Sequence, residues 1–262
     1  MKLALHGASG RMGLTIAKIV AEADDIQLVG AVCGADDSAL GKDIGELAGV
    51  GTLGVECSAD AGSALLGADV VIDFSVAGAV GPLVNIAARQ KVAVVCGTTN
   101  LDDKGKQALD AAAKAVPVLW APNMSLGVQV LAELLEQALQ RLGPSFDAEI
   151  VEIHHRRKVD SPSGTATRLG DVVRKVRPET RELRGRDGDV GARTDEEMAI
   201  FGVRGGDVIG DHTVYLLGPS ERIELTHRAT DRGLFAQGAV RAARFLAGKA
   251  AGSYTISDVV NG

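Results

Sequence analysis

The segment from Glu152 to Ala166 gathers the side chains best suited to acid–base chemistry. It reads Glu-Ile-His-His-Arg-Arg-Lys-Val-Asp-Ser-Pro-Ser-Gly-Thr-Ala. A histidine such as His154 or His155 titrates near neutral pH and can donate or accept a proton. Lys158 adds a positive charge and a second group able to donate a proton. The segment therefore predicts proton transfer on a substrate that carries negative charge.

An anion site is expected directly after these residues. Ser163, Gly164 and Thr165 stand where a helix is expected to begin, and free N–H groups at a helix start favour a carboxylate or phosphate. The alternative is a simple helix cap, with the basic side chains as a solvated rim. Adjacent histidines at a strand end point to opposite faces, and no Cys or His pair nearby has zinc spacing, so no metal site is expected.

A glycine-rich turn near the N-terminus predicts dinucleotide binding. The run Gly7-Ala8-Ser9-Gly10-Arg11-Met12-Gly13 follows the first apolar strand pattern and opens the first helix pattern. Glycines there let the backbone turn tightly and approach a pyrophosphate. The spacing is G-x-x-G-x-x-G in place of the usual G-x-G-x-x-G, so the prediction depends on the order strand, turn, helix.

The choice between NADH and NADPH is less defined. NAD enzymes carry a carboxylate for the ribose about 20 residues beyond the turn, where this chain has Cys33 and Gly34. Asp36 and Asp37 follow and suit either a ribose contact or a solvent-exposed loop, and Arg11 suits a 2′-phosphate. We therefore expect weak discrimination between the two cofactors.

Two further segments are expected at the same sheet edge. They are Gly97-Thr98-Thr99 and Ala121-Pro122-Asn123-Met124, each directly after an expected strand. Each alone suits an ordinary loop, but together with the glycine-rich turn they outline a cofactor cleft.

The strands and helices that position these residues are predicted by alternating short and long apolar segments. The first half predicts a doubly wound parallel sheet, with ligands at the carboxyl ends of its strands. The expected strands are Leu3–His6, Ile26–Val32, Val70–Phe74, Val92–Cys96 and Val118–Trp120, and the expected helices are Met12–Ala23, Ala77–Arg89 and Asp102–Ala115.

The pattern changes after Pro122-Asn123. A long amphipathic helix, a strand and a second helix are expected first, followed by antiparallel strands between glycine-rich turns. These elements are Leu126–Leu142, Glu149–His154, a helix opening near Ser163, and the strands Met198–Arg204, Thr213–Leu217 and Arg222–His227. Residues 179–196 predict a mobile loop, and Leu234–Ala247 predicts a helix that returns to the first domain.

The predicted fold class is thus α/β with two domains. A Rossmann-type doubly wound sheet is expected from residues 1–124 and 235–262, and a second α+β domain with a mixed or antiparallel sheet from residues 125–234. With 262 residues, 46% of them hydrophobic, the chain has enough apolar material for both cores.

Composition narrows the function further. The net charge is −6, yet residues 156–193 hold eleven Lys and Arg against six Asp and Glu, which favours capture of a small anion over nucleic acid, or else forms a solvated basic face. No apolar run is long enough for a membrane span. The N-terminus lacks a signal-peptide pattern, and three cysteines suit a reducing compartment. We expect a cytoplasmic protein without nucleic-acid or membrane partners.

The His-His segment resembles the signature of the 4-hydroxy-tetrahydrodipicolinate reductase family. That signature has the form E-x-H-H-x-x-K-x-D-x-P-S-G-T-A, and every fixed position is present. The glycine-rich turn, Gly97-Thr98-Thr99, Pro122-Asn123-Met124-Ser125, Asp207–His212 and Glu224–His227 also resemble the family, so the similarity spans nearly the whole chain. Cys33-Gly34 departs from it, because many members have an acidic and then a basic residue there.

The resemblance implies reduction of a cyclic intermediate in the diaminopimelate–lysine pathway by NADPH or NADH. It implies His154 as acid/base and Lys158 as proton donor. It further implies substrate contacts from His155, Ser163, Gly164 and Thr165, and a homotetramer formed through the second domain. The cofactor would be lined by residues 7–12, by Cys33 and Gly34, and by residues 97–99 and 121–124.

Two other functions also fit part of the sequence. A homoserine- or inositol-type dehydrogenase would share the N-terminal half, but it would need other catalytic residues than the His-His-x-x-Lys arrangement. A nucleotide-sensing regulator would bind the cofactor without turnover, and would normally bring a DNA-binding element that this chain lacks.

Overall fold

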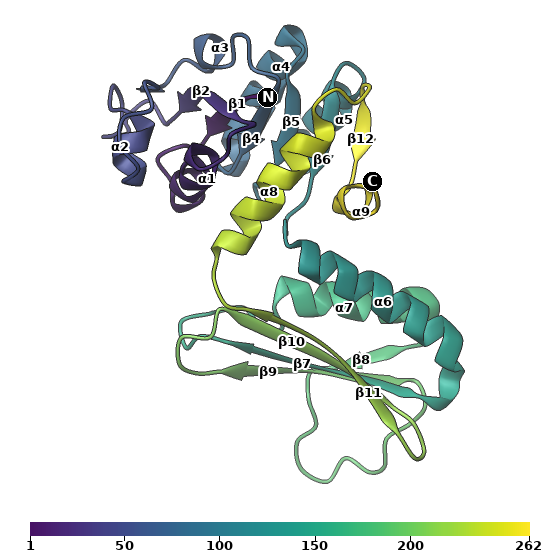
Figure 1. The fold of residues 1–262 in the computed structure, drawn as a ribbon. Coiled ribbons are helices and arrows are strands. Elements are labelled where there is room, and N and C mark those ends of the chain that lie inside the picture. The colour runs from purple at the N-terminus through teal and green to yellow at the C-terminus, as the bar shows by residue number, and fades with distance from the viewer. The chain divides into compact units, whose positions relative to one another are not determined.

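The computed structural model describes all 262 residues, which divide into two compact units (Figure 1). Unit 1 comprises residues 1–125 and 233–262, and unit 2 comprises residues 126–232. None of the helices combines the length and apolar character needed to cross a membrane.

Unit 1 is built on a seven-stranded parallel sheet with the strand order β12-β6-β5-β4-β1-β2-β3. Its strands are β1 (Lys2–His6), β2 (Gln27–Val32), β3 (Cys57–Ser58), β4 (Val70–Asp73), β5 (Ala93–Cys96), β6 (Pro117–Trp120) and β12 (Gly252–Tyr254). The strands are apolar runs because a parallel sheet with helices on both faces buries both sides of each strand. All four residues of β4 and of β5 are buried.

Helices cover both faces of this sheet. They are α1 (Arg11–Ala21), α2 (Ile44–Ala48), α3 (Ala61–Ala64), α4 (Ala77–Gln90), α5 (Asp103–Ala113), α8 (Gly233–Leu246) and α9 (Ile256–Asn261). Helices α1 and α8 pack together on one face, and α3, α4 and α5 pack on the other. The predicted Rossmann-type sheet is therefore confirmed. The sequence patterns did not predict the short elements β3, α2, α3, β12 and α9.

Unit 2 is a five-stranded mixed sheet with two helices on one face (Figure 1). Its elements are α6 (Leu126–Leu142), the 3-10 turn η1 (Gly143–Ser145), β7 (Asp147–His154), α7 (Gly164–Val176), β8 (Arg181–Leu183), β9 (Glu197–Arg204), β10 (Gly210–Leu217) and β11 (Arg222–Ala229). The strand order is β11-β10-β7-β9-β8. Apolar side chains of α6 and α7 meet the even-numbered residues of β7 and β10 in one core.

Two expectations for unit 2 were wrong. The run from Met198 was expected to be antiparallel to its neighbours, but β9 runs parallel to both β7 and β8. Two crossover connections cause this: α7 returns the chain to the start of β8, and residues 184–196 return it to the start of β9. Residues 179–196 were expected to be a mobile loop throughout, but they include β8.

Candidate active site

The turn after β1 forms one wall of a cavity of about 730 Å³ in unit 1. Five residues predicted for the cofactor line it: Gly7, Ser9, Gly10, Cys33 and Gly34. The other predicted cofactor residues do not line it: Ala8, Arg11, Met12, residues 97–99 and residues 121–124. Phe74, Ser75 and Val76, which follow β4, were missed, although they too follow a strand at this edge.

The glycine-rich turn has the shape needed to bind an anion. Gly7 has a positive φ of 72°, and a Cβ there would lie 2.4 Å from the backbone oxygen of Phe74. A Cβ on Gly13 would lie 2.3 Å from the oxygen of Ala8, so α1 can start this close to the turn only with glycine there. Gly10 caps α1 without a side-chain bond, and no acidic residue stands in the first turn. The residues present therefore fit the pyrophosphate of a dinucleotide.

A buried carboxylate, Asp73, fixes the loops around this cavity. It accepts hydrogen bonds from His6 Nδ1 at 2.6 Å, Ser75 Oγ at 2.6 Å and Thr98 Oγ1 at 2.7 Å. Burial alone would raise the pKa of Asp73, but these hydrogen bonds outweigh it and hold the pKa below its usual range. Neither Asp73 nor His6 was predicted as a site residue. The only signal for them was a polar residue at the carboxyl end of an otherwise apolar strand.

The second polar centre lies wholly within unit 2, around Glu152 and His154. Both side chains lie on the helix-facing side of β7, beyond the apolar core. Glu152 is fully buried, and one of its oxygens lies 2.5 Å from His154 Nδ1. The same carboxylate accepts two hydrogen bonds from Arg204, at 2.7 and 2.8 Å, and one from the Ser163 amide at 3.1 Å.

These contacts set the charge states at the centre. Burial would raise the pKa of Glu152, but its hydrogen bonds from Arg204 and His154 hold that pKa below its usual range, so the carboxylate is ionised. Burial lowers the pKa of His154, and the charges of Lys158 and Arg204 lower it further, while Glu152 opposes the shift. A carboxylate at Nδ1 leaves Nε2 of His154 as the nitrogen available to another partner.

A second histidine packs against the first. His212 on β10 is edge-to-face with His154, at 5.1 Å between ring centroids. Its Nε2 lies 3.0 Å from Ser163 Oγ, which also accepts a hydrogen bond from the Ala166 amide. Burial is the main cause that lowers the pKa of His212 to about 4, so its ring is neutral at pH 7.

Two glycines leave the space that these side chains occupy. A Cβ on Gly210 would lie 2.9 Å from His154 Nε2, and a Cβ on Gly202 would lie 3.1 Å from Glu152 Oε1. Glycine inside a strand is typical of such close approach. Neither glycine was predicted as a site residue.

The remaining predicted residues surround this centre. Lys158 Nζ forms an ion pair with Asp160 at 2.8 Å, and its charge also lowers the pKa of His154 and of His212. His155 leaves the strand, and its Nε2 lies 3.2 Å from a guanidinium nitrogen of Arg232, which was not predicted. Ser163 caps the N-terminus of α7.

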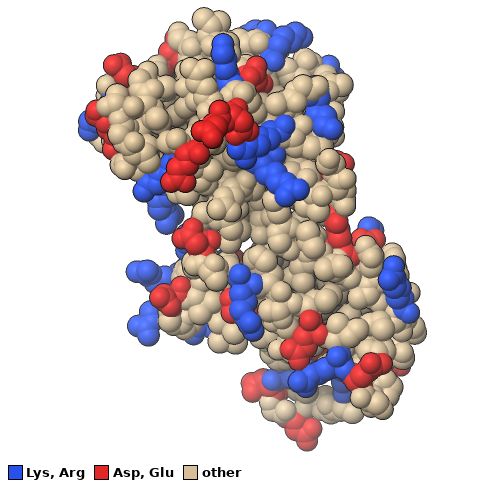
Figure 2. Space-filling model, in the orientation of Figure 1, with Lys and Arg blue, Asp and Glu red and all other residues tan.

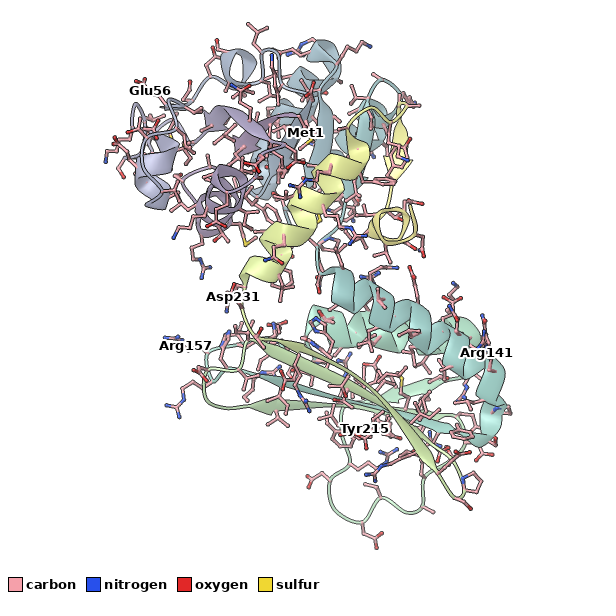
Figure 3. The ribbon with its side chains drawn as sticks, in the orientation of Figure 1. Met1, Glu56, Arg141, Arg157, Tyr215 and Asp231 are labelled. Carbon is pink, nitrogen blue, oxygen red and sulfur yellow. The ribbon has the colours of Figure 1, made fainter.

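Gly164 and Thr165 form the first turn of α7, which contains no acidic residue. Because Ser163 is bonded to both Glu152 and His212, the helix N-terminus lies next to the histidine pair. Strand pairing adds the end of β11, since Gly210 pairs with Ala229 and Asp211 with Ile153. Figure 3 shows Arg157 and Asp231 at this same end of the sheet.

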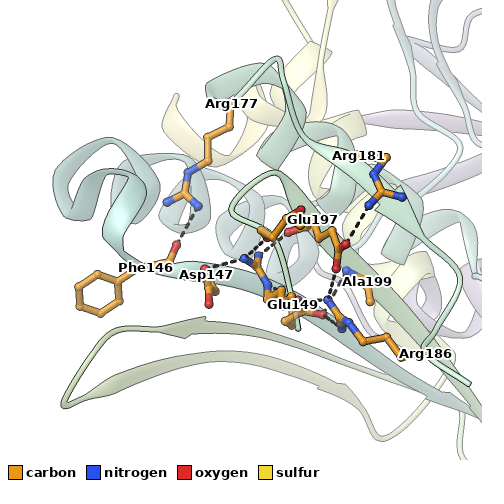
Figure 4. A network of polar contacts seen from close by, with 10 residues as sticks. Phe146, Asp147, Glu149, Arg177, Arg181, Arg186, Glu197 and Ala199 are labelled. Atoms are coloured by element: carbon orange, nitrogen blue, oxygen red, sulfur yellow. Dashed lines mark hydrogen bonds and ion pairs between the residues drawn. The ribbon is translucent and has the colours of Figure 1, made fainter. Parts of the chain in front are cut away.

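Three arginines of the basic segment 156–193 lie away from this centre and bind carboxylates of the sheet. Arg186 and Arg193 both bind Glu149 on the opposite face of β7, and Arg181 and Arg186 bind Glu197 (Figure 4). These arginines therefore attach residues 184–196 to the sheet. On the visible face of the molecule, basic and acidic residues are interspersed and form no single basic field (Figure 2).

Family models match both halves of the chain. The N-terminal model of dihydrodipicolinate reductase matches residues 1–124, and its C-terminal model matches residues 127–260. The 4-hydroxy-tetrahydrodipicolinate reductase of Anaeromyxobacter sp. (strain Fw109-5) is 47% identical, covering 99% of this chain and 97% of its own. That of Syntrophotalea carbinolica is 44% identical, covering 99% and 98%.

Solved structures share the fold. A dipicolinate-bound dihydrodipicolinate reductase from Paenisporosarcina sp. TG-14 superposes with a TM-score of 0.79 at 22% identity, covering 97% of each chain. A myo-inositol dehydrogenase from Corynebacterium glutamicum superposes with a TM-score of 0.56 at 15% identity, covering 100% of this chain and 92% of its own. The inositol-type alternative thus shares the architecture at lower similarity.

Proposed function

Because the chain belongs to the dihydrodipicolinate reductase family, whose members reduce 4-hydroxy-tetrahydrodipicolinate in diaminopimelate and lysine biosynthesis with a nicotinamide cofactor, we propose that His154 and Lys158 handle the proton of this reduction. The reaction takes up a hydride and a proton and releases water. A group that holds a mobile proton is therefore needed beside the substrate ring.

The contact between Glu152 and His154 carries this proposal. An ionised, buried carboxylate at Nδ1 fixes the orientation of the ring and stabilises its protonated form. Nε2 is then the nitrogen that exchanges a proton with the substrate. Lys158 contributes positive charge and a second proton, and the ion pair with Asp160 holds its ammonium group.

The substrate carboxylates have a matching set of donors. The amides of Gly164 and Thr165 at the start of α7 and the hydroxyl of Ser163 suit one carboxylate. His155 and Arg232 suit the other carboxylate, because the Arg232 guanidinium places a positive charge next to the His155 imidazole. Charge-assisted hydrogen bonds of this kind contribute about 1.5–3 kcal/mol each.

The nicotinamide cofactor would be held by unit 1. Gly7, Ser9 and Gly10, with the uncapped start of α1, suit its pyrophosphate, and the other predicted cofactor segments follow strands at the same sheet edge. When bound, the cofactor supplies the hydride. The chain's own task is to bind the substrate and to supply the proton.

The assembly we propose is a cytoplasmic homotetramer formed through unit 2. The sheet face opposite α6 and α7 carries apolar side chains that are only partly buried, among them Val151, Phe201, Val203 and Tyr215. Val203 is 47% exposed, and Figure 3 shows Tyr215 on β10 of this sheet. Such a face favours contact with further copies. The three buried, free cysteines suit a reducing compartment.

Replacement of the two proposed proton donors tests the assignment. We expect His154→Gln and Lys158→Met each to lower kcat by about 100-fold or more, in line with general acid–base contributions. The activity is followed as cofactor absorbance at 340 nm. Binding of pyridine-2,6-dicarboxylate and of ADP-ribose, measured by calorimetry, should persist in both variants. A variant with wild-type kcat removes its residue from the mechanism.

A further inference from the structure

Asp37 forms part of the cofactor cavity although it stands four residues beyond the strand-end position. The loop after β2 brings its carboxylate back to the glycine-rich turn, where Oδ2 lies 2.5 Å from Ser9 Oγ. Its other oxygen accepts a hydrogen bond from the Ala39 amide at 2.8 Å. The hydroxyl and the amide lower the pKa of Asp37, so the group is a carboxylate at neutral pH.

The cavity has space for a sugar next to this carboxylate. Cys33 and Gly34 line the same wall as Ser9 and Asp37. No atom lies within 4 Å of the position that a Cβ of Gly34 would take. In a dinucleotide fold, the adenosine ribose lies at this end of the second strand, beside the turn that holds the pyrophosphate.

The charged groups of the cavity are acidic. Asp60 lines it as a second carboxylate, and its lining residues include no Lys or Arg. Two basic residues on neighbouring segments lie outside the lining. Lys42, whose charge lowers the pKa of Asp37, lines a separate hollow with Asp43 and Glu56, and Arg11 is exposed at the start of α1. A 2′-phosphate would therefore meet negative charge and no guanidinium or ammonium group within the lining.

We propose that Asp37 replaces the missing strand-end carboxylate, accepts hydrogen bonds from the 2′- and 3′-hydroxyls of the adenosine ribose, and makes the protein selective for NADH. The proposal depends on the cofactor site proposed above, and it revises the weak discrimination expected from Cys33 and Gly34. Selectivity has two sources, the charge-assisted hydrogen bonds of the diol and the repulsion of a 2′-phosphate.

Cofactor fragments test the proposal without turnover. Calorimetry on the full chain compares ADP-ribose with 2′-phospho-ADP-ribose, which differ only in the 2′-phosphate. We expect the wild-type protein to bind ADP-ribose at least tenfold more tightly. Asp37→Asn should lower this preference at least tenfold, by weakening ADP-ribose and strengthening the phosphorylated fragment. Asp36→Asn is the matched control, because Asp36 is exposed and lies outside the cavity lining; its preference should stay within twofold of wild type.

Each result has a defined meaning. Equal or tighter binding of 2′-phospho-ADP-ribose by the wild-type protein overturns the proposal, and this measurement needs no variant to fold. An unchanged preference in Asp37→Asn, or an equal loss in Asp36→Asn, overturns the role of Asp37 while leaving the cofactor site intact. If the wild-type protein binds neither fragment, the cofactor site itself is refuted, and the role of Asp37 with it.

Discussion

The contact between Glu152 and His154 makes a prediction that separates catalysis from folding. Glu152→Gln keeps the shape of the side chain but removes the charge that opposes the lowering of the His154 pKa by burial. The protonated ring then becomes scarcer at any pH above its pKa. The activity of the variant should therefore depend on pH in a way that a purely structural defect does not.

The size of the effect follows from the interaction lost. A hydrogen bond to a charged group contributes about 1.5–3 kcal/mol, and 1.4 kcal/mol is a tenfold change in an equilibrium. The bond here is 2.5 Å long and completely buried on the carboxylate side. We expect kcat/KM to fall by about 10- to 100-fold at pH 8, with progressive recovery toward lower pH as His154 gains its proton.

The assay is the pH profile of kcat/KM for cofactor oxidation, over the range in which circular dichroism shows a folded protein. Glu149→Gln is the matched control. Glu149 lies on the same strand, is also buried, and also binds arginines, but on the opposite face of the sheet. Glu152→Gln removes the ion-pair partner of Arg204, and Glu149→Gln removes one of the two carboxylates that Arg186 and Arg193 each contact, so both variants should lose stability. Only Glu152→Gln should change the pH profile, and a loss that is uniform across pH would refute the role assigned to Glu152.

Two further predictions concern neighbours of the same histidine. Gly210→Ala should lower kcat by about tenfold or more, since a Cβ 2.9 Å from His154 Nε2 displaces the ring. Gly205→Ala is the control and should leave kcat unchanged, because no atom lies within 4 Å of its Cβ position. Equal losses in the two variants would contradict the steric argument. Urea titrations should show the free energy of unfolding falling as pH drops from 6.5 to about 4, because unfolded His212 takes up a proton that the folded protein, with a pKa of about 4, resists. His212→Gln should remove roughly 3 kcal/mol of that pH dependence; an unchanged dependence would exclude His212 as its source.

The sequence predicts the architecture well where a pattern is local. The bounds of α6 agree residue for residue with the expected helix Leu126–Leu142, because a long amphipathic period is a property of one segment. The direction of β9 could not be predicted in this way. It depends on two crossovers, α7 and residues 184–196. A strand carries the same local pattern whether its partner runs parallel or antiparallel.

The candidate site, too, could be predicted only where its residues are close in sequence. His154, Lys158 and Ser163 are close in sequence, so one motif indicates them together. Arg204 and His212 come from other strands, and only the pairing of β7 with β9 and β10, which sets His154 opposite Arg204 and Glu152 opposite His212, brings them to the motif. The sequence named Asp36 and Asp37 together and could not separate them, because a count along the chain from the glycine-rich turn does not register that the loop after β2 folds back and brings Asp37 to Ser9.

The discontinuity of unit 1 has a consequence for biosynthesis. Helix α8 covers one face of the sheet, and Gly238 brings its backbone so close to Met124 that a Cβ would lie 1.8 Å from the Met124 oxygen. This helix and β12, which extends the sheet beside β6, are translated only after the whole of unit 2. While the ribosome makes residues 126–232, the first 125 residues must wait with apolar strands uncovered, whereas unit 2 is continuous and can fold as soon as it emerges. A nascent chain stalled before residue 233 is thus a complete unit 2 joined to a unit 1 whose sheet still lacks α8 and β12.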